Sequence, residues 1–224
     1  MAKINPVYII ELKRAAICKA KTGGFARVRP DDLLADLIKK TLKDNKSNKL
    51  KIDNNKIEDV IIGCALPEGM QGFNIARMAA MLAGIPQSVP AMTLNRYCAS
   101  GLQSIAQAAD RIAAGGADLI VAGGVESMSA VPMIGATPRP NPKLFINKDK
   151  NIDKNIDITG LAYGMGITAE NLVQKYKVSR EQQDLFAYQS NLKAVKAIKA
   201  NAFQNCIINK IKNNEGARNY KNQN

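Results

Sequence analysis

The residue of this chain best suited to chemistry is Cys98. It lies in Asn95–Leu102, between an apolar run that predicts a strand and an Ala-rich run that predicts a helix. The amides and macrodipole at a helix N-terminus stabilise a thiolate, which lowers the pKa of the thiol and makes it a nucleophile. Small residues follow Cys98, so a substrate can approach closely, as at a nucleophile elbow. A packed core cysteine at a tight strand–helix junction is the alternative, and the residues alone leave both open.

The residue types that are missing exclude several other chemistries. The 224 residues contain no His, so they cannot form a Ser-His-Asp triad, a Cys-His pair or a His-ligated metal site. The four cysteines, Cys18, Cys64, Cys98 and Cys206, include no Cys-x-x-Cys pair. We therefore predict no metal site and no disulfide framework, and expect free thiols in a reducing compartment.

Short apolar runs alternate with helical patterns over the first 124 residues. Strands are predicted at Val7–Ile10, Val60–Gly63, Ala91–Leu94 and Leu119–Ala122, and helices from Pro30 to about Leu42, at Asn74–Ala83 and at Ala99–Ala114. This alternation predicts an α/β fold with a parallel or mixed sheet of four or five strands, covered by helices and buried on both faces. Cys98 is then expected at the C-terminal edge of the sheet, at the start of a mostly buried helix.

The pattern changes after Gly124. The segment Val125–Ile158 is rich in Pro, Met, Asn and Asp, which predicts a long functional loop or an inserted subdomain. Helical periodicity returns at Thr168–Tyr176 and at Ser179–Ala200, and the second of these begins with a capping box. Cys206–Ile211 is a candidate last strand, and nothing after Lys212 predicts order.

Positive charge is concentrated in polar stretches of the chain. The formal net charge is +13, and residues 191–224 hold seven Lys or Arg and one Glu. Because only two aromatic residues, Phe203 and Tyr220, lie among these charges, we predict solvated loops and a tail, and no specific nucleic-acid partner. No run of 18 apolar residues is present, so no membrane span is predicted. A cleaved presequence is an alternative for the basic first thirty residues. The early apolar run favours a strand, and we predict a cytoplasmic location.

Two motifs carry a family resemblance. Asn95–Gly101 (Asn-Arg-Tyr-Cys-Ala-Ser-Gly) and Gly123–Ser129 (Gly-Gly-Val-Glu-Ser-Met-Ser) resemble the thiolase family of acyl-CoA acyltransferases. Val28–Leu34 resembles the start of the family's first helix, and Met165–Asn171 and Ser179–Asp184 resemble its loop domain. The resemblance extends over roughly residues 6–208. It implies a thiolase-like layered α/β fold that is incomplete. Residues 1–124 would be the N-terminal half, 125–208 a partial loop domain, and 209–224 a degenerate Lys/Asn-rich tail.

The resemblance also implies roles for single residues. Cys98 matches the nucleophile that accepts the acyl group, and its backbone N–H resembles one donor of the oxyanion hole. Met165 matches a residue that lines the acyl pocket, although it could equally be a core residue. Glu126 and Ser127 lie near the family's site, with loop capping as the alternative role, and Gly123 and Gly124 serve backbone geometry. The substrate would be a coenzyme A thioester of fatty acid metabolism, with no cofactor and no metal.

Other features of the family are missing from these residues. The family's second half supplies a His and a Cys in a Cys-x-Gly motif, whereas this chain has no His and Cys206 is followed by Ile207 and Ile208. We therefore expect a truncated thiolase whose activity alone is doubtful. A folded but inactive remnant is the alternative. The expected partners are acyl-CoA and either further copies of the chain, as a homo-oligomer, or a separate C-terminal half. Apolar surface left uncovered would favour self-association.

Overall fold

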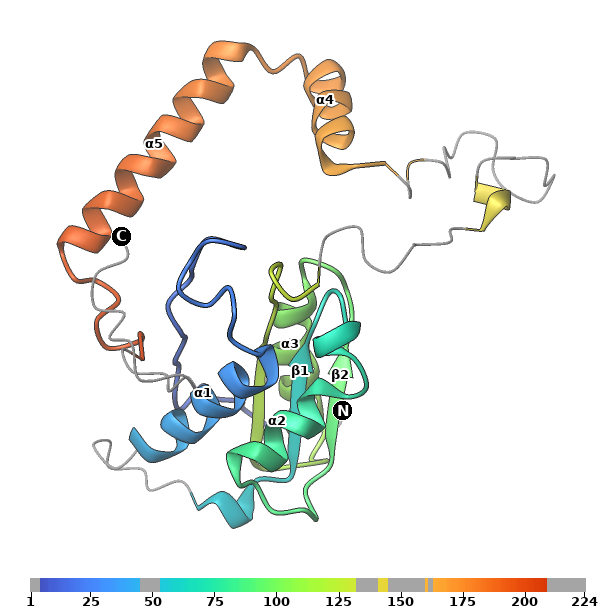
Figure 1. The fold of residues 1–224 in the computed structure, drawn as a ribbon, viewed down its shortest axis with the longest axis vertical. Coiled ribbons are helices and arrows are strands. Elements are labelled where there is room, and N and C mark those ends of the chain that lie inside the picture. Colours follow the sequence, from blue (N-terminus) through green and yellow to red (C-terminus); the bar gives the residue numbers. More distant parts are fainter. Residues whose placement is uncertain (1–4, 45–52, 132–140, 145–159, 161–162, 209–224) are drawn as a thin grey trace. The chain divides into compact units, whose positions relative to one another are not determined.

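A computed structural model describes residues 5–44, 53–131, 141–144, 160 and 163–208 (Figure 1). The chain divides into two compact units. The first comprises Met1–Gly135 together with Asn205–Asn224, and the second comprises Ala136–Gln204. The two units are described separately below.

A parallel sheet forms the centre of the first unit. Its strands are β1 (Asp59–Gly63), β2 (Ala91–Leu94) and β3 (Ile120–Gly124), in the order β2-β1-β3. Val60 is opposite both Ala91 and Val121, so the three strands end close together at one edge. The β-α alternation and the parallel sheet are thus confirmed. Every residue of β1 is buried, whereas β2 and β3 are only partly covered, so burial on both faces holds for the central strand alone.

Three helices cover this sheet, and the second and third of them connect its strands. They are α1 (Pro30–Asp44), α2 (Ile75–Ala83) and α3 (Ser100–Ala113), with short 3-10 turns η1 (Asn54–Lys56) and η2 (Gly69–Gln71) between the elements. Local chemistry explains the ends of α2. The Asn74 side chain accepts a hydrogen bond from Arg77 N at 3.1 Å, and Gly84 ends the helix at φ 80°. Pro30 and two acidic residues begin α1, as a helix N-terminus favours.

The hydrophobic core lies between α1, α2 and one face of the sheet. Successive strand residues point to opposite faces, so Val60 and Ile62 belong to this core while Ile61 faces the other side. The opposite face is covered by α3, which packs against β1 and β3. The other buried members of the core are Leu34, Ala35, Ile38, Ile57, Ala76, Ala79, Ala80, Ile85 and Val89. The unit is therefore layered helix–sheet–helix.

The N-terminal apolar run does not form the predicted strand. Val7–Ile10 has no strand pairing, and the side chains of Tyr8 and Ile9 are 76% and 74% exposed. The sheet of the described residues has three strands, fewer than the four or five expected. Hydrophobic composition makes a segment suitable for a strand, but a strand also needs a neighbour that accepts its backbone hydrogen bonds. Here the prediction is wrong because Val7–Ile10 pairs with neither edge of the sheet.

The predicted last strand is reduced to a single bridge. Arg14 N donates to Cys206 O at 2.8 Å, and Ile208 N donates to Arg14 O at 3.0 Å, which makes a parallel bridge between Arg14 and Ile207. The rest of the predicted strand, from residue 209 on, lies outside the described residues, as does most of the predicted loop at 125–158.

The second unit is helical in its described part. It contains η3 (Pro142–Leu144), α4 (Met165–Tyr176) and α5 (Arg180–Lys199). Both predicted helices are confirmed, and so is the capping box of α5, in which Ser179 and Gln182 each accept from the other's backbone N–H. Neither α4 nor α5 buries a side chain.

Candidate active site

Cys98 lies in the turn between β2 and α3. Strand β2 ends at Leu94 and helix α3 begins at Ser100, so Cys98 follows the carboxyl end of a strand and precedes a helix by two residues. Its side chain is exposed. The predicted place at the C-terminal edge of the sheet is confirmed. The expectation of a mostly buried helix is wrong, because only Ser100, Ser104 and Ala108 of α3 are buried.

The turn that carries Cys98 is held by its own hydrogen bonds. The Asn95 side chain accepts from Tyr97 N at 2.7 Å. The Ser100 hydroxyl accepts from Arg96 N at 2.8 Å and donates to Tyr97 O at 2.6 Å. These bonds keep Tyr97 at φ 47°, a left-handed conformation that a bulky residue rarely adopts without such support. The backbone at Cys98 is therefore fixed from both sides.

Helix α3 begins without a capping side chain. Ala99 occupies the N-cap position and offers no side-chain acceptor to the first amides of the helix. In contrast, α5 begins at Ser179, whose hydroxyl accepts from Gln182 N. A bare helix N-terminus attracts negative charge through its unpaired N–H groups and the macrodipole. Ala99 N and Ser100 N already donate to Arg96 O and Tyr97 O at 3.1 and 3.0 Å, so the macrodipole of α3, rather than these two amides, favours negative charge next to Cys98.

Two glycines allow α3 to start close to the sheet. A Cβ on Gly63 would lie 2.3 Å from Ser100 C and 2.4 Å from Ser100 O, so only glycine fits there. A Cβ on Gly124 would lie 3.3 Å from Gly101 Cα. The buried Ser104 hydroxyl bridges the same elements, since it lies 2.7 Å from both Gly101 O and Gly123 O. We predicted that Gly123 and Gly124 serve backbone geometry. The close approach of Gly124 to Gly101 supports this role for Gly124.

A polar network joins the loops that follow β1 and β3. Glu126 accepts from Ala65 N at 2.7 Å and from Gln71 Nε2 at 2.6 Å. Gln71 is fully buried; its Nε2 also donates to Leu66 O at 2.8 Å, and its Oε1 accepts from Ser127 N. Ser127 Oγ in turn accepts from Ala130 N at 3.3 Å. In this structure Glu126 and Ser127 therefore make the loop-capping contacts that the sequence allowed.

A second cysteine lies at the same edge of the sheet. Cys64 follows β1, is buried, and donates its backbone N–H to Leu94 O at 3.0 Å. Burial raises the pKa of its thiol to about 11, and the negative charge of Glu126 adds to this effect. Cys64 is thus a neutral thiol at physiological pH, whereas the exposed Cys98 is open to reagents.

Met165 is the first residue of α4, in the second unit, and its side chain is 69% exposed. Met165 thus belongs to no core of the described second unit, and its role stays a prediction. Its thioether is free to make apolar contacts.

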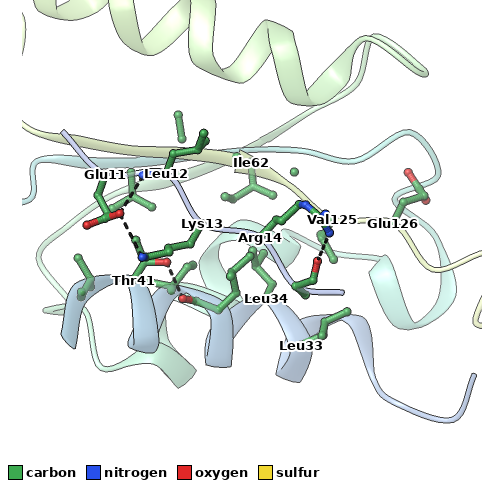
Figure 2. A pocket seen from close by; sticks show the side chains of 18 of the residues that line it. Glu11, Leu12, Lys13, Arg14, Leu33, Leu34, Thr41, Ile62, Val125 and Glu126 are labelled. Carbon is green, nitrogen blue, oxygen red and sulfur yellow. Dashed lines mark hydrogen bonds and ion pairs between the residues drawn. The ribbon is translucent and has the colours of Figure 1, made fainter. Parts of the chain in front are cut away.

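A hollow of the first unit lies away from Cys98. A cavity of about 430 Å³ is enclosed by the segment 11–17, by α1 and by the strands β1 and β3. Figure 2 shows Glu11 and Thr41 toward one end and Glu126 toward the other. No residue of the Cys98 turn, 95–99, lines it. The cavity is mostly apolar and lies where the N-terminal segment crosses the core without packing tightly against it.

The described residues, 5–44, 53–131, 141–144, 160 and 163–208, contain neither a metal-ligand cluster nor a membrane-spanning helix. No group of three or more acidic, Cys or His side chains is placed there to hold a metal ion. None of the helices in those ranges has the length and apolar character that a bilayer crossing needs.

Sequence reasoning missed Gln71 and Ser104. Both are fully buried polar residues whose hydrogen bonds join segments distant in the sequence. Neither stands in a periodic or charged pattern. The Gly-rich surroundings of Gln71, which predict close backbone packing, are the one signal that could have drawn attention to it.

Comparison with known proteins gives a consistent result. A model of the family described as "Thiolase, N-terminal domain" matches residues 7–223. The chain is 46% identical over 200 residues to 3-ketoacyl-CoA thiolase of Bacillus subtilis, covering 89% of this chain and 47% of the relative. It is 36% identical to peroxisomal 3-ketoacyl-CoA thiolase 1 of Arabidopsis thaliana, covering 91% of this chain and 43% of the relative.

Among solved structures, the dimeric peroxisomal thiolase of Saccharomyces cerevisiae is similar, with a TM-score of 0.77 and 32% identity. That match covers 94% of this chain and 52% of the yeast chain. The chain therefore spans about half the length of the relatives that it matches.

Proposed function

Because this chain belongs to the thiolase family, we propose that Cys98 accepts an acyl group in transfer between coenzyme A and a 3-ketoacyl chain. One observation carries the proposal. Cys98 is exposed in a rigid turn, directly before a helix that has no side-chain cap. That arrangement favours a thiolate and leaves it accessible to a thioester.

The covalent step follows from this placement. The Cys98 sulfur attacks the thioester carbonyl carbon, a new C–S bond forms, and coenzyme A leaves as its thiolate, which takes up a proton. The backbone N–H of Cys98 is one donor that stabilises the negative charge on the carbonyl oxygen of the tetrahedral intermediate. A second nucleophile, either coenzyme A or the α-carbon of another acyl thioester, then takes the acyl group from Cys98. Coenzyme A thus enters and leaves as a substrate, and no cofactor or metal takes part.

We further propose that Met165 lines the pocket for the acyl chain. It is an exposed, flexible apolar side chain at the start of α4, which suits contact with alkyl groups of different shapes. The acyl chain length follows from neither residue.

Acid–base catalysis limits what these residues can do alone. Activating the thiol and deprotonating an attacking carbon both need groups with a suitable pKa, and the 224 residues contain no His. We therefore expect single acylation of Cys98 without sustained turnover by the isolated chain. The lack of His among these residues also favours the second candidate function, a folded thiolase-like protein without catalysis.

Mass spectrometry of the intact chain after incubation with acetyl-CoA tests the proposal. We expect one added acetyl group, mapped to the peptide that contains Cys98 and absent from Cys98→Ala. Cys206→Ala is the matched control and should be acetylated like the wild type. Acetylation that persists in Cys98→Ala would contradict the assignment, and no acetylation of the wild-type chain would favour the inactive alternative.

The partners and location of the chain are also proposals. We propose acyl-CoA as the ligand, and further copies of the chain or a separate polypeptide with the acid–base groups as the protein partner. We propose no specific nucleic-acid partner, because the basic stretch 191–224 contains only two aromatic residues, Phe203 and Tyr220. A cytoplasmic location stays a prediction, and two Arabidopsis relatives are named peroxisomal.

A further inference from the structure

The loops after β1 and β3 are joined by a group that we call the polar clamp. It consists of Gln71 and Glu126 with the backbone groups that they hold, Ala65 N, Leu66 O and Ser127 N. Gln71 is fully buried and uses both amide hydrogens and its oxygen, so each of its polar atoms has a partner. Removing such a side chain leaves buried groups without hydrogen bonds, which is costly. The clamp is therefore a rigid connection.

The clamp is continuous with the ends of all three strands. Cys64, next to Ala65, donates its N–H to Leu94 O at 3.0 Å, at the end of β2. Val125, next to Glu126, donates its N–H to Gly63 O at 3.0 Å, at the end of β1. The residue after Leu94 is Asn95, whose side chain holds the turn of Cys98. The path from the clamp to the turn of Cys98 is therefore short. It runs from Ala65 to its neighbour Cys64, across the hydrogen bond from Cys64 N to Leu94 O, and on to Asn95.

Close packing gives a second connection between the clamp and the nucleophile. Gly63 lies directly against the backbone of Ser100 and Gly101, where a Cβ would come within 2.6 Å of three atoms. Any shift of the β1 end is thus transmitted to the first turn of α3, because there is no free space between them. The distance from the Cys98 sulfur to the amides of α3 depends on this contact.

From these contacts we infer that Gln71 is a positioning residue for Cys98. It acts through Glu126, by holding the ends of β1 and β3 on which the turn of Cys98 and the start of α3 rest. The inference rests on the proposed role of Cys98 as nucleophile, and it gives the buried glutamine a part in the reaction without contact to the substrate.

Glu126 itself is better suited to holding this edge than to proton transfer. Both of its carboxylate oxygens already accept hydrogen bonds, one from Ala65 N and one from Gln71 Nε2. Its charge also raises the pKa of the nearby Cys64 thiol, which is opposite to what an activating group would do. The clamp therefore acts by geometry, through the position of Cys98 relative to α3.

The test is the pH profile of Cys98 alkylation by iodoacetamide, measured in the full chain by peptide mapping. Gln71→Met keeps the size of the side chain and removes its hydrogen bonds. We expect it to slow alkylation at pH 8 by about three- to tenfold and to change the pH profile, since the Cys98 sulfur moves relative to the N-terminus of α3. Gln107→Met, the same substitution at an exposed position of α3, is the matched control and should behave like the wild type.

Two further variants separate positioning from a general loss of stability. Glu126→Gln should slow alkylation in the same direction, and the double variant Gln71→Met/Glu126→Gln should be no slower than the slower single variant, because both act through one connection. The exchanged pair Gln71→Glu/Glu126→Gln can remake the contact between the two side chains but not the bond to Leu66 O, so it should alkylate faster than Glu126→Gln and more slowly than the wild type. If Gln71→Met does not fold, Glu126→Gln and the exchanged pair provide the same comparison.

A lower melting temperature with an unchanged pH profile in folded Gln71→Met or Glu126→Gln would overturn the inference, and so would additive effects of the two substitutions. Alkylation of Cys98 by iodoacetamide needs no coenzyme A, so it tests the positioning of Cys98 separately from acyl transfer. If the wild-type chain is not acetylated while the variants still shift the pH profile, the proposed function fails and the positioning of Cys98 by Gln71 stands.

Discussion

At the scale of single residues, Cys64 and Cys98 show how position sets the behaviour of a thiol. Both follow a strand of the same sheet and lie at the same edge. Cys64 is enclosed by the core and next to Glu126, whereas Cys98 is exposed before a helix N-terminus. Burial and a negative neighbour disfavour a thiolate, and exposure beside helix amides favours one. The exposed Cys98 should therefore react with alkylating reagents far faster than the buried Cys64.

The raised pKa of Cys64 predicts that the protein loses stability at alkaline pH. Its pKa is about 11 in the folded protein and 9.0 in the absence of the fold, so the folded state holds its proton where the unfolded state releases it. The protonated Cys64 thiol therefore contributes to the free energy of unfolding. This contribution is complete below pH 9 and is lost as pH rises through about 11, and the shift of two pKa units sets its maximum at about 3 kcal/mol. Urea unfolding of wild type and Cys64→Ala at pH 8 and pH 10.5 measures it.

Wild type should lose more stability between these pH values than Cys64→Ala, whatever the cost of the substitution itself. Ile61→Val is the control, because it removes a buried methylene next to the same strand end without removing a titrating group. Equal slopes for wild type and Cys64→Ala would contradict the prediction.

At the scale of elements, the contact between β1 and α3 predicts a contrast between two glycines. Gly63→Ala places a Cβ within 2.6 Å of three backbone atoms of Ser100 and Gly101, so the strand and the helix must separate. Such overpacking typically costs about 1–3 kcal/mol. Gly101→Ala is the matched control, since a Cβ there meets no atom within 4 Å and alanine favours a helix by up to about 1 kcal/mol. Equilibrium unfolding in urea separates the two, and equal stability of both variants would contradict the contact.

The start of α5 provides a second prediction for an element. Ser179→Ala removes the hydroxyl that accepts from Gln182 N, which should destabilise the helix by about 1 kcal/mol. Circular dichroism of a peptide spanning residues 177–200 should therefore show less helix. Ser190→Ala in the middle of the same helix should raise the helix content slightly, because alanine has the higher helix propensity. Loss of helix in both peptides would show that the cap has no special role.

These elements also show what the sequence can and cannot predict. The caps at Asn74 and Ser179 and the end at Gly84 depend on residues a few positions away, and their positions were predictable. The strand at Val7–Ile10 was predicted wrongly because its formation depends on a partner distant in the sequence. The place of Cys98 followed from the order of strand, cysteine and helix. The contact of Gln71 with Glu126 spans 55 residues, and no local pattern indicates it.

At the scale of the whole chain, the two units differ in what they bury. The first unit has a core of buried side chains between its sheet and the helices α1 and α2. In the second unit, α4 and α5 bury no side chain, and apolar residues such as Phe186, Leu192 and Val195 are exposed. Isolated helices of this length are marginal in water, because most helix stability in proteins comes from packing. The two units should therefore open with very different free energies.

Hydrogen exchange of the 224-residue chain, followed by mass spectrometry, measures this difference. We expect the amides of β1 to exchange slowly, since all its residues are buried and paired on both sides. The amides of α5 should exchange nearly as fast as in an unstructured peptide. Trypsin should accordingly cut first at the exposed Lys193, Lys196 or Lys199 and leave the core of the first unit intact. Strong protection of α5 would instead mean that its apolar side chains are covered in solution. A fall in that protection on dilution would then identify a second copy of the chain as the cover, because only an intermolecular contact depends on concentration.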